Sequence, residues 1–215
     1  MNTDFIKDAA RRLGLTCTGI ASAHLPVPET QQPVCPLASG KGRERYDLTA
    51  LLPHCQAAVV VLFPYYNPDA EKTNLSLYCQ LEDYHLVVPA YLEKLAAVLS
   101  SYGGTQRCIA DTSPLTERLL AVEAGLGFMG DNQCLIHPMY GSYCFIGAVL
   151  TTLPLAPDTP MDRECLHCGA CRRICPGGCL TDGAYDYRLC KSYLTQKKEE
   201  LTDTEKAVIA RTPLI

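Results

Sequence analysis

The chain has 215 residues, of which 47% are hydrophobic and 20% charged, and its formal net charge is −4. This composition fits one medium-sized soluble domain with a small appendage, and neither half has the basic excess typical of a stand-alone nucleic-acid binder. No apolar run approaches the ~18 residues that a membrane span needs, and the first residues lack the pattern of a signal peptide. The protein is therefore expected in the reducing cytoplasm, with its 13 cysteines as free thiols or metal ligands.

The first third of the chain predicts a helix followed by two strands. Thr3 is placed to cap the helix, and Gly14 is placed to end it. Residues 15–21 are typical of a strand, whereas the proline- and glycine-rich residues 23–45 are typical of a loop. The apolar run at 57–63 indicates a strand that is buried on both faces, as in an α/β sheet.

The middle of the chain predicts a long helix, a short strand and another helix. Residues 81–102 have a helical pattern, in which Pro89 should introduce a kink or reset the start. Residues 106–110 form a short strand that leads to Asp111. Pro114 can then occupy the first turn of the next helix.

Residues 126–130 form a glycine-rich turn, and strands are expected at 134–137 and 143–152, joined by the turn between them. Helices and apolar strands alternate over residues 1–152, which predicts a layered α/β or α+β domain. The three prolines within residues 153–160 are typical of a linker.

Two capping signals follow in the last part of the chain. Asp186 can cap a helix that runs through Leu194, and Thr202-Asp-Thr-Glu205 forms a capping box for a final helix. Such a short segment rarely has a sufficient core of its own, so a bound metal cluster is expected to help hold it together.

The strongest local motif is C-x2-C-x2-C-x3-C-P, the bacterial ferredoxin spacing, formed by Cys165, Cys168, Cys171 and Cys175. The first three thiolates can wrap one corner of a 4Fe–4S cluster, and the fourth points away toward a second cluster in two-cluster ferredoxins. Zinc knuckles instead pair two separated C-x2-C hooks. Cys190 follows on a predicted helix, where it is either a distal ligand of a second cluster or a buried thiol.

Two other residues could carry chemistry. Asp111 lies where a strand leads into a helix, which is the edge at which open α/β sheets bind ligands, and its carboxyl group could donate a proton. The local pattern alone favours a helix N-cap instead. Taken by itself, His85 is more typical of a packed or surface histidine than of a catalytic one.

The glycine-rich turn, with Asn132 after it, could let the backbone approach a large planar or phosphate-bearing ligand, although a plain connector is the default interpretation. Seven other cysteines show no ligand spacing and are expected to be small apolar fillers or incidental thiols. They are Cys17, Cys35, Cys55, Cys79, Cys108, Cys134 and Cys144.

Six motifs follow one another in a recognisable order. They are Asp83-Tyr-His85, Asp111-Thr-Ser-Pro-Leu-Thr-Glu-Arg118, Ala124-Gly-Leu-Gly-Phe-Met-Gly130, Tyr140-Gly-Ser-Tyr143, the four-cysteine motif and Cys190-Lys-Ser-Tyr-Leu-Thr195. In this order and spacing the chain resembles the epoxyqueuosine reductase family, which reduces the epoxide of epoxyqueuosine in tRNA and is related to the corrinoid reductive dehalogenases.

The resemblance implies a nitroreductase-like, cobalamin-binding catalytic domain over residues 1–155 and an incomplete ferredoxin-like 4Fe–4S domain over residues 161–215. An external electron donor would reduce the clusters, which would pass electrons to the cobalamin cobalt. By motif position Asp111 would donate a proton, and His85 would line the pocket. The residues that would contact cobalamin are Ser113, Gly125, Leu126, Gly127, Gly130, Asn132 and Tyr143.

The resemblance also implies that Cys165, Cys168 and Cys171 hold one cluster, while Cys175 and Cys190 belong to the other. Relatives have a second cysteine motif after the position of Ile215. Accordingly, either the native chain continues beyond this residue or Cys179 and Cys190 are recruited in place of that motif.

Two departures concern the cofactor pocket: Asp131 stands where many relatives have lysine, and Ala148 stands where glutamate is common. The expected substrate is a tRNA anticodon stem-loop, and the expected assembly is a monomer or weak oligomer away from membranes. Two alternatives remain, a corrinoid and iron–sulfur reductase of a small molecule and an electron-transfer module without its own substrate.

Overall fold

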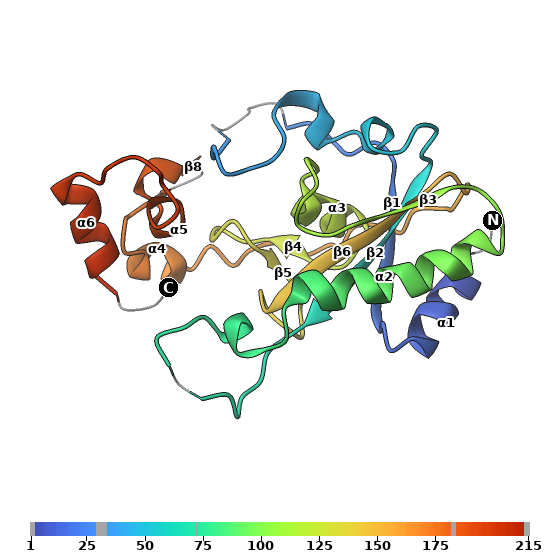
Figure 1. Cartoon of the computed structure of the whole chain (residues 1–215), viewed down its shortest axis with the longest axis horizontal. Coiled ribbons are helices and arrows are strands. Elements are labelled where there is room, and N and C mark those ends of the chain that lie inside the picture. Colours follow the sequence, from blue (N-terminus) through green and yellow to red (C-terminus); the bar gives the residue numbers. More distant parts are fainter. Residues whose placement is uncertain (1–2, 29–33, 72, 182–183, 213–215) are drawn as a thin grey trace.

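The computed structural model describes residues 3–28, 34–71, 73–181 and 184–212. A four-stranded sheet forms its centre, helices cover both faces of that sheet, and the residues after about 160 form a smaller body at one end (Figure 1). The predicted mixture of helices and strands is confirmed. None of the described helices is both long and apolar enough to cross a membrane.

The central sheet is antiparallel throughout. Its strands, in spatial order, are β1 (Cys17–Ser22), β2 (Ala57–Pro64), β6 (Cys144–Thr151) and β3 (Gln106–Ile109). Strand β2 is buried on both faces as predicted, because Val59 and Val61 join one core cluster while Val60 joins the other. The strand is buried on both faces although the sheet is antiparallel, because helices cover both faces of the sheet.

Three helices cover the sheet. Helices α1 (Asp4–Arg12) and α2 (Tyr84–Ser100) pack on one face, and α3 (Glu117–Glu123) packs on the other. In α2 the buried side chains recur every three or four residues, which is the spacing of one helix face. They are Val88, Leu92, Leu95 and Leu99. Helix α2 starts after Asp83, whose carboxylate accepts the His85 N–H at 2.9 Å, and it continues through Pro89. Thr3 precedes α1 without a side-chain capping bond, contrary to the prediction.

One prediction for residues 114–152 is wrong. Pro114 is not in the first turn of α3, because that helix begins at Glu117 and Pro114 lies in the turn before it. The two strands expected after the glycine-rich turn are confirmed as β5 (Leu135–Ile136) and β6, and His137 and Gly141 close the turn between them with backbone bonds of 2.9 Å. Strand β5 pairs with β4 (Phe128–Met129). The glycine-rich segment therefore contains a strand, and a tight turn closes this small hairpin through a bond from the Gly130 N–H to the Cys134 carbonyl at 2.9 Å.

The C-terminal body consists of short elements, namely α4 (Ala170–Ile174), β7 (Leu180–Thr181), β8 (Ala184–Tyr185), α5 (Lys191–Leu194) and α6 (Asp203–Ala210). Asp186 caps only a single 3-10 turn at Tyr187–Leu189, because the extended backbone of Cys190 separates this turn from α5. The predicted capping box of α6 is confirmed, with Thr202 and Glu205 exchanging backbone-to-side-chain bonds. The remaining 3-10 turns lie at Gly42–Arg45, Leu48–Ala50 and Leu77–Gln80.

Candidate functional site

Asp111 follows the end of β3 in a left-handed backbone conformation, with φ of 60°. Aspartate tolerates this region better than most residues do. Glu117, at the start of α3, holds the turn from both sides. Its Oε2 accepts the Asp111 N–H at 3.2 Å, and its Oε1 accepts the Ser113 hydroxyl at 3.0 Å. The N-cap interpretation of Asp111 is therefore wrong, because Thr116 occupies the N-cap position of α3 and the Asp111 carboxylate points elsewhere.

The Asp111 carboxylate meets two side chains from the start of α2. The Tyr84 hydroxyl donates to Asp111 Oδ2 at 2.8 Å, and His85 Nε2 lies 3.4 Å from the same oxygen. On its other side, His85 Nδ1 lies 2.7 Å from Asp83 Oδ1. The hydrogen bond to Asp83, and then that to Asp111, raise the pKa of His85 above its usual value. The local pattern predicted a packed or surface histidine, and the His85 side chain is half-exposed; its position between two carboxylates was not predicted, and its role in the site stays a prediction.

Tyr84 was not recognised from the sequence, although it adjoins His85. Its ring stacks on Phe145 at a centroid distance of 4.2 Å and on His85 at 4.0 Å. Burial and the hydrogen bond to Asp111 raise the pKa of Tyr84 well above its usual value, so the hydroxyl stays protonated and remains a donor.

A cavity of about 390 Å³ opens beside this group. Its polar lining comprises Ser39, Arg45, Tyr84, Asp111, Ser113, Thr116, Glu117 and Arg118. Burial raises the pKa of Glu117 to about 7. Within the described parts of the chain, Arg45 Nε and Thr116 Oγ1 are buried without a hydrogen-bond partner. Neither atom is accessible from the cavity; its polar lining is what suits it to a polar ligand.

An aromatic surface continues from Tyr84 through Phe145 to Tyr65 and Tyr143. Tyr65 lies 4.6 Å from Phe145 and 5.7 Å from Tyr143, measured between ring centroids. The Tyr143 ring is in turn 5.1 Å from the exposed ring of Tyr66. Exposed rings beside a polar cavity fit a large, partly planar ligand, so the chain has chemistry suited to a corrin ring and its polar substituents.

The glycines near β4 have structural causes within the chain. Gly125 ends α3 with φ of 70°. A Cβ atom on Gly127 would lie 2.5 Å from the Ile136 carbonyl oxygen, and one on Gly130 would lie 2.5 Å from the Asn132 amide oxygen. Leu126 is a buried core residue. The connector interpretation thus accounts for this segment, and contact of these residues with a cofactor stays a prediction.

Asp131 joins this hairpin to the cysteine segment. Its Oδ1 lies 2.9 Å from His167 Nδ1, and the Cys165 sulfur lies within 4.8 Å of the ligand atoms of both residues. His167 is held with φ of 49°, in the left-handed region. The first cysteine of the ferredoxin-like motif is therefore beside the hairpin that carries Asn132.

The other motif cysteines divide into two groups. Cys168 and Cys171 lie at the start of α4, and Cys171 is close enough to Cys134 to affect its titration. Cys175, after α4, instead lies 3.3 Å from Cys179, measured between the sulfur atoms. The Cys179 thiol also interacts with that of Cys190. Cysteines are the ligands of iron–sulfur clusters, and both groups supply them.

Partial burial opposes ionisation of Cys175, but bonds from the Cys179 thiol and from the backbone N–H groups of Cys179, Gly177 and Gly178 lower the pKa of Cys175 below its usual value. A thiolate is the form that binds metals. Cys179 lies outside the ferredoxin spacing, and the sequence offered it, with Cys190, only as a possible replacement for ligands of the second motif.

Comparison with known proteins gives one consistent result. The family model for epoxyqueuosine reductase QueG, DUF1730, matches residues 45–112. The epoxyqueuosine reductase of Atelocyanobacterium thalassa is 31% identical over 209 residues, which cover 90% of this chain and 68% of that protein. The epoxyqueuosine reductase of Cyclobacterium marinum is 32% identical over 227 residues, which cover 95% of this chain and 73% of that protein.

Among solved structures, the chain is similar to a crystal structure of epoxyqueuosine reductase with a tRNA-TYR epoxyqueuosine-modified tRNA stem loop. The TM-score is 0.82 at 26% identity, and the match covers 94% of this chain and 59% of the solved one. The chain thus spans between 59% and 73% of the length of these three proteins. With the fold, the ordered motifs and these relatives in agreement, the chain belongs to the epoxyqueuosine reductase family.

Proposed function

We propose that the chain takes part in the cobalamin- and iron–sulfur-dependent reduction of the epoxide of epoxyqueuosine in tRNA. The observation that carries the proposal is the Asp111 carboxylate, which Tyr84 and His85 hold at the rim of a cavity next to an aromatic surface. Family membership supports the same reaction. A tRNA substrate also implies a cytoplasmic protein.

The domain assignment that supports this function has two parts. Residues 1–155 would bind cobalamin, which when bound supplies a strongly reducing cobalt centre. Residues 161–215 would hold the iron–sulfur clusters and receive electrons from an external donor. The contact between Asp131 and His167 supports this arrangement, because it brings the cysteine segment against the cofactor-binding part.

The proposed function also assigns ligand and cofactor-contact roles to individual residues. Cys165, Cys168 and Cys171 would hold the first cluster, while Cys175 and Cys190 would belong to the second. For cobalamin, the exposed aromatic surface around Tyr143 supports contact with the corrin. Ser113 and Asn132 are the other side chains proposed to face it, together with the backbone of residues 125–130.

Side chains of the protein would donate the proton that the epoxide oxygen needs and would replace it after donation. Removal of an epoxide oxygen as water consumes two electrons and two protons, so an acid must stand next to that oxygen. Asp111 would donate from its carboxyl group. The Tyr84 hydroxyl fixes the orientation of that group, and His85, whose pKa is raised by Asp83 and Asp111, can return a proton to it.

The test is anaerobic reconstitution of the chain with iron, sulfide and cobalamin, followed by incubation with an epoxyqueuosine-containing anticodon stem-loop and a chemical reductant. We expect cobalt and iron to be retained and queuosine to form. Asp111→Asn should keep both metals and lose turnover, whereas Asp8→Asn, on the exposed face of α1, should behave like the unchanged chain. Failure to retain cobalt would refute the proposal.

The same assay separates the two alternatives. Turnover of the free nucleoside without binding of the stem-loop at low salt would indicate a small-molecule reductase. Full activity as an electron carrier in the Asp111→Asn variant, with no epoxide turnover in either protein, would indicate an electron-transfer module.

A further inference from the structure

A buried cysteine outside the ferredoxin spacing, Cys179, lies between two other cysteines, Cys175 and Cys190, and the three form a thiol cluster. Cys179 is only 5% exposed, and its sulfur atom lies 3.3 Å from that of Cys175. The thiol of Cys190 interacts with that of Cys179, and the Tyr185 hydroxyl interacts with Cys190. Three cysteines from two chain segments thus meet in one place, Cys175 and Cys179 from the turn after α4 and Cys190 from the start of α5.

The backbone between Cys175 and Cys179 is shaped around a sulfur atom. The Gly178 N–H donates to the Cys175 carbonyl at 3.2 Å, and the backbone N–H groups of Gly177, Gly178 and Cys179 interact with the Cys175 thiol. Gly178 has φ of 64°, which glycine adopts without strain. Hydrogen bonds from backbone N–H groups to ligand sulfurs are a feature by which proteins tune iron–sulfur clusters.

Cys190 is brought to this turn by close packing of two chain segments. A Cβ atom on Gly177 would lie 1.7 Å from the Leu189 carbonyl oxygen, so only glycine permits the two segments to approach this closely. The Asp186 N–H donates to the Cys179 carbonyl at 2.9 Å, which fixes the second segment from the other end. The three thiols are therefore held together by the backbone as well as by their own contacts.

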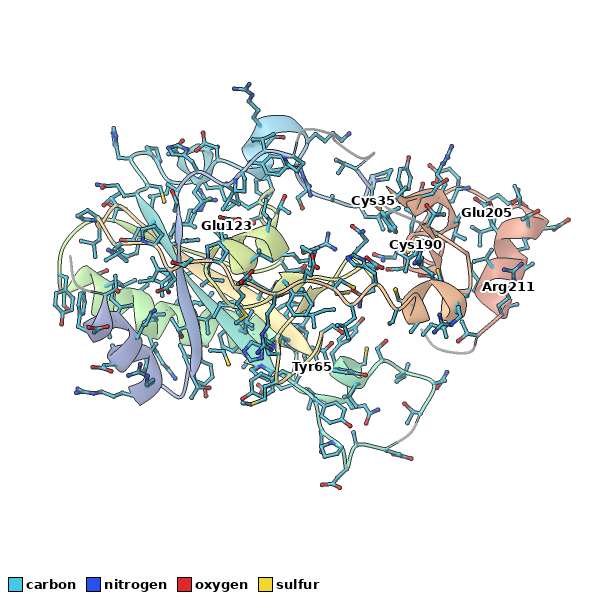
Figure 2. All side chains as sticks on the ribbon, turned by 180° about the vertical axis from the view of Figure 1, so that it is seen from behind. Cys35, Tyr65, Glu123, Cys190, Glu205 and Arg211 are labelled. Atoms are coloured by element: carbon cyan, nitrogen blue, oxygen red, sulfur yellow. The ribbon has the colours of Figure 1, made fainter. Side chains whose placement is uncertain are left out.

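A fourth thiol near this cluster belongs to the N-terminal part of the chain. Cys35, on the loop between β1 and β2, lies on the side of the catalytic part that faces Cys190 (Figure 2). It is close enough to Tyr185 for the two side chains to interact electrostatically. The thiol cluster of Cys175, Cys179 and Cys190 is thus located at the junction between the two parts of the molecule.

We propose that Cys179 is a thiolate ligand of the second iron–sulfur cluster, together with Cys175 and Cys190. This inference rests on the proposed iron–sulfur function and adds a ligand that the C-x2-C-x2-C-x3-C-P spacing does not contain. A cluster requires its ligand sulfurs to be further apart than 3.3 Å, and the two glycines between Cys175 and Cys179 allow the turn to open.

The experiment is anaerobic reconstitution of the full chain with iron and sulfide, followed by quantification of both elements and electron paramagnetic resonance after reduction. The unchanged chain should hold about eight irons as two 4Fe–4S clusters, and Cys179→Ser should hold about four. The matched control is Cys108→Ser, a half-buried cysteine on β3, which should retain about eight. Cys190→Ser should show the same loss as Cys179→Ser.

The signal of the cluster that remains in Cys179→Ser shows that the domain still folds, so the loss cannot be ascribed to unfolding. Retention of about eight irons by Cys179→Ser would overturn the inference and leave the proposed function intact. So would a total of about four irons in the unchanged chain, as would zinc in place of iron at this site. No iron uptake at all would overturn the proposed function as well.

Discussion

Glu117 offers the sharpest test of the site, because a carboxyl group is mostly buried there. Its pKa rises from 4.5 to about 7, chiefly through burial. Holding this carboxylate ionised in the folded state therefore costs about 3 kcal/mol, because one pKa unit corresponds to about 1.4 kcal/mol. The cost is absent below pH 4.5, where folded and unfolded chains both carry the proton. It grows between pH 4.5 and about 7, because only the folded chain keeps the proton there, and it is complete above that range.

Substitution of Glu117 by glutamine removes this charge but also one of its two accepted hydrogen bonds, from Ser113 or from the Asp111 N–H. The lost bond costs about 1 kcal/mol at every pH. At pH 8 the glutamine variant should therefore be more stable than the unchanged chain by about 2 kcal/mol. At about pH 5 the two effects should nearly cancel, because the ionisation cost is then only about 1 kcal/mol.

The assay is urea denaturation of both proteins at pH 5 and pH 8, with free energies of unfolding from linear extrapolation. Glu123→Gln is the control, since it removes a carboxylate from the same helix outside the cavity lining. It should not produce the pH-dependent gain. A difference between the Glu117→Gln variant and the unchanged chain that is the same at both pH values would refute the argument from burial.

Other substitutions test the neighbouring contacts. Tyr84→Phe keeps the ring stacking but loses the bond to Asp111, so epoxide reduction should slow by about 5- to 30-fold, corresponding to about 1–2 kcal/mol; an unchanged rate would show that the hydroxyl does not position the carboxylate. Gly19→Ala would place a Cβ atom 2.0 Å from a backbone oxygen at the end of α3, and thermal unfolding should reveal a loss above ~3 kcal/mol. Leu95→Ala, in the core, should cost about 2–5 kcal/mol in urea denaturation, whereas Leu86→Ala, which is 66% exposed, should cost less than about 0.5 kcal/mol; equal losses would contradict the observed orientation of α2.

The elements with strong periodicity could be predicted from the sequence. In β2 and α2 the apolar residues in the sequence are the ones buried in the structure. The spacing of apolar residues therefore predicted both the type of element and its buried side. The capping box of α6 is likewise a local signal with a local cause. Such features need no information from distant parts of the chain.

The sequence predictions failed where contacts with residues far along the chain determine the local structure. Asp111 has the local pattern of a helix cap, but Tyr84 and His85, from an element 26 residues earlier, form the contacts of its carboxylate. The two-residue strand β4, with which β5 pairs, was not predicted, because the glycine-rich segment that contains it has no strand periodicity.

The thiol cluster shows a different limit. Spacing identifies Cys165, Cys168, Cys171 and Cys175, because ligands of one cluster lie on one short loop. It does not identify Cys179, whose position depends on how the turn after the motif packs against the segment before Cys190. The predicted roles of these cysteines, and those of Ser113 and Asn132, stay predictions.

The place of β6 in the sheet has a consequence for the biogenesis of the protein. This strand pairs with β2 on one side and with β3 on the other, although both are synthesised before it. The roughly 80 residues between the end of β2 and the start of β6 take on the order of 4–16 s to translate at 5–20 residues per second. During that interval one edge of the most apolar strand lacks its neighbour, and unpaired strand edges invite aggregation. The nascent chain is therefore expected to need chaperone protection until β6 leaves the ribosome, before any metal can be inserted into the segment that follows.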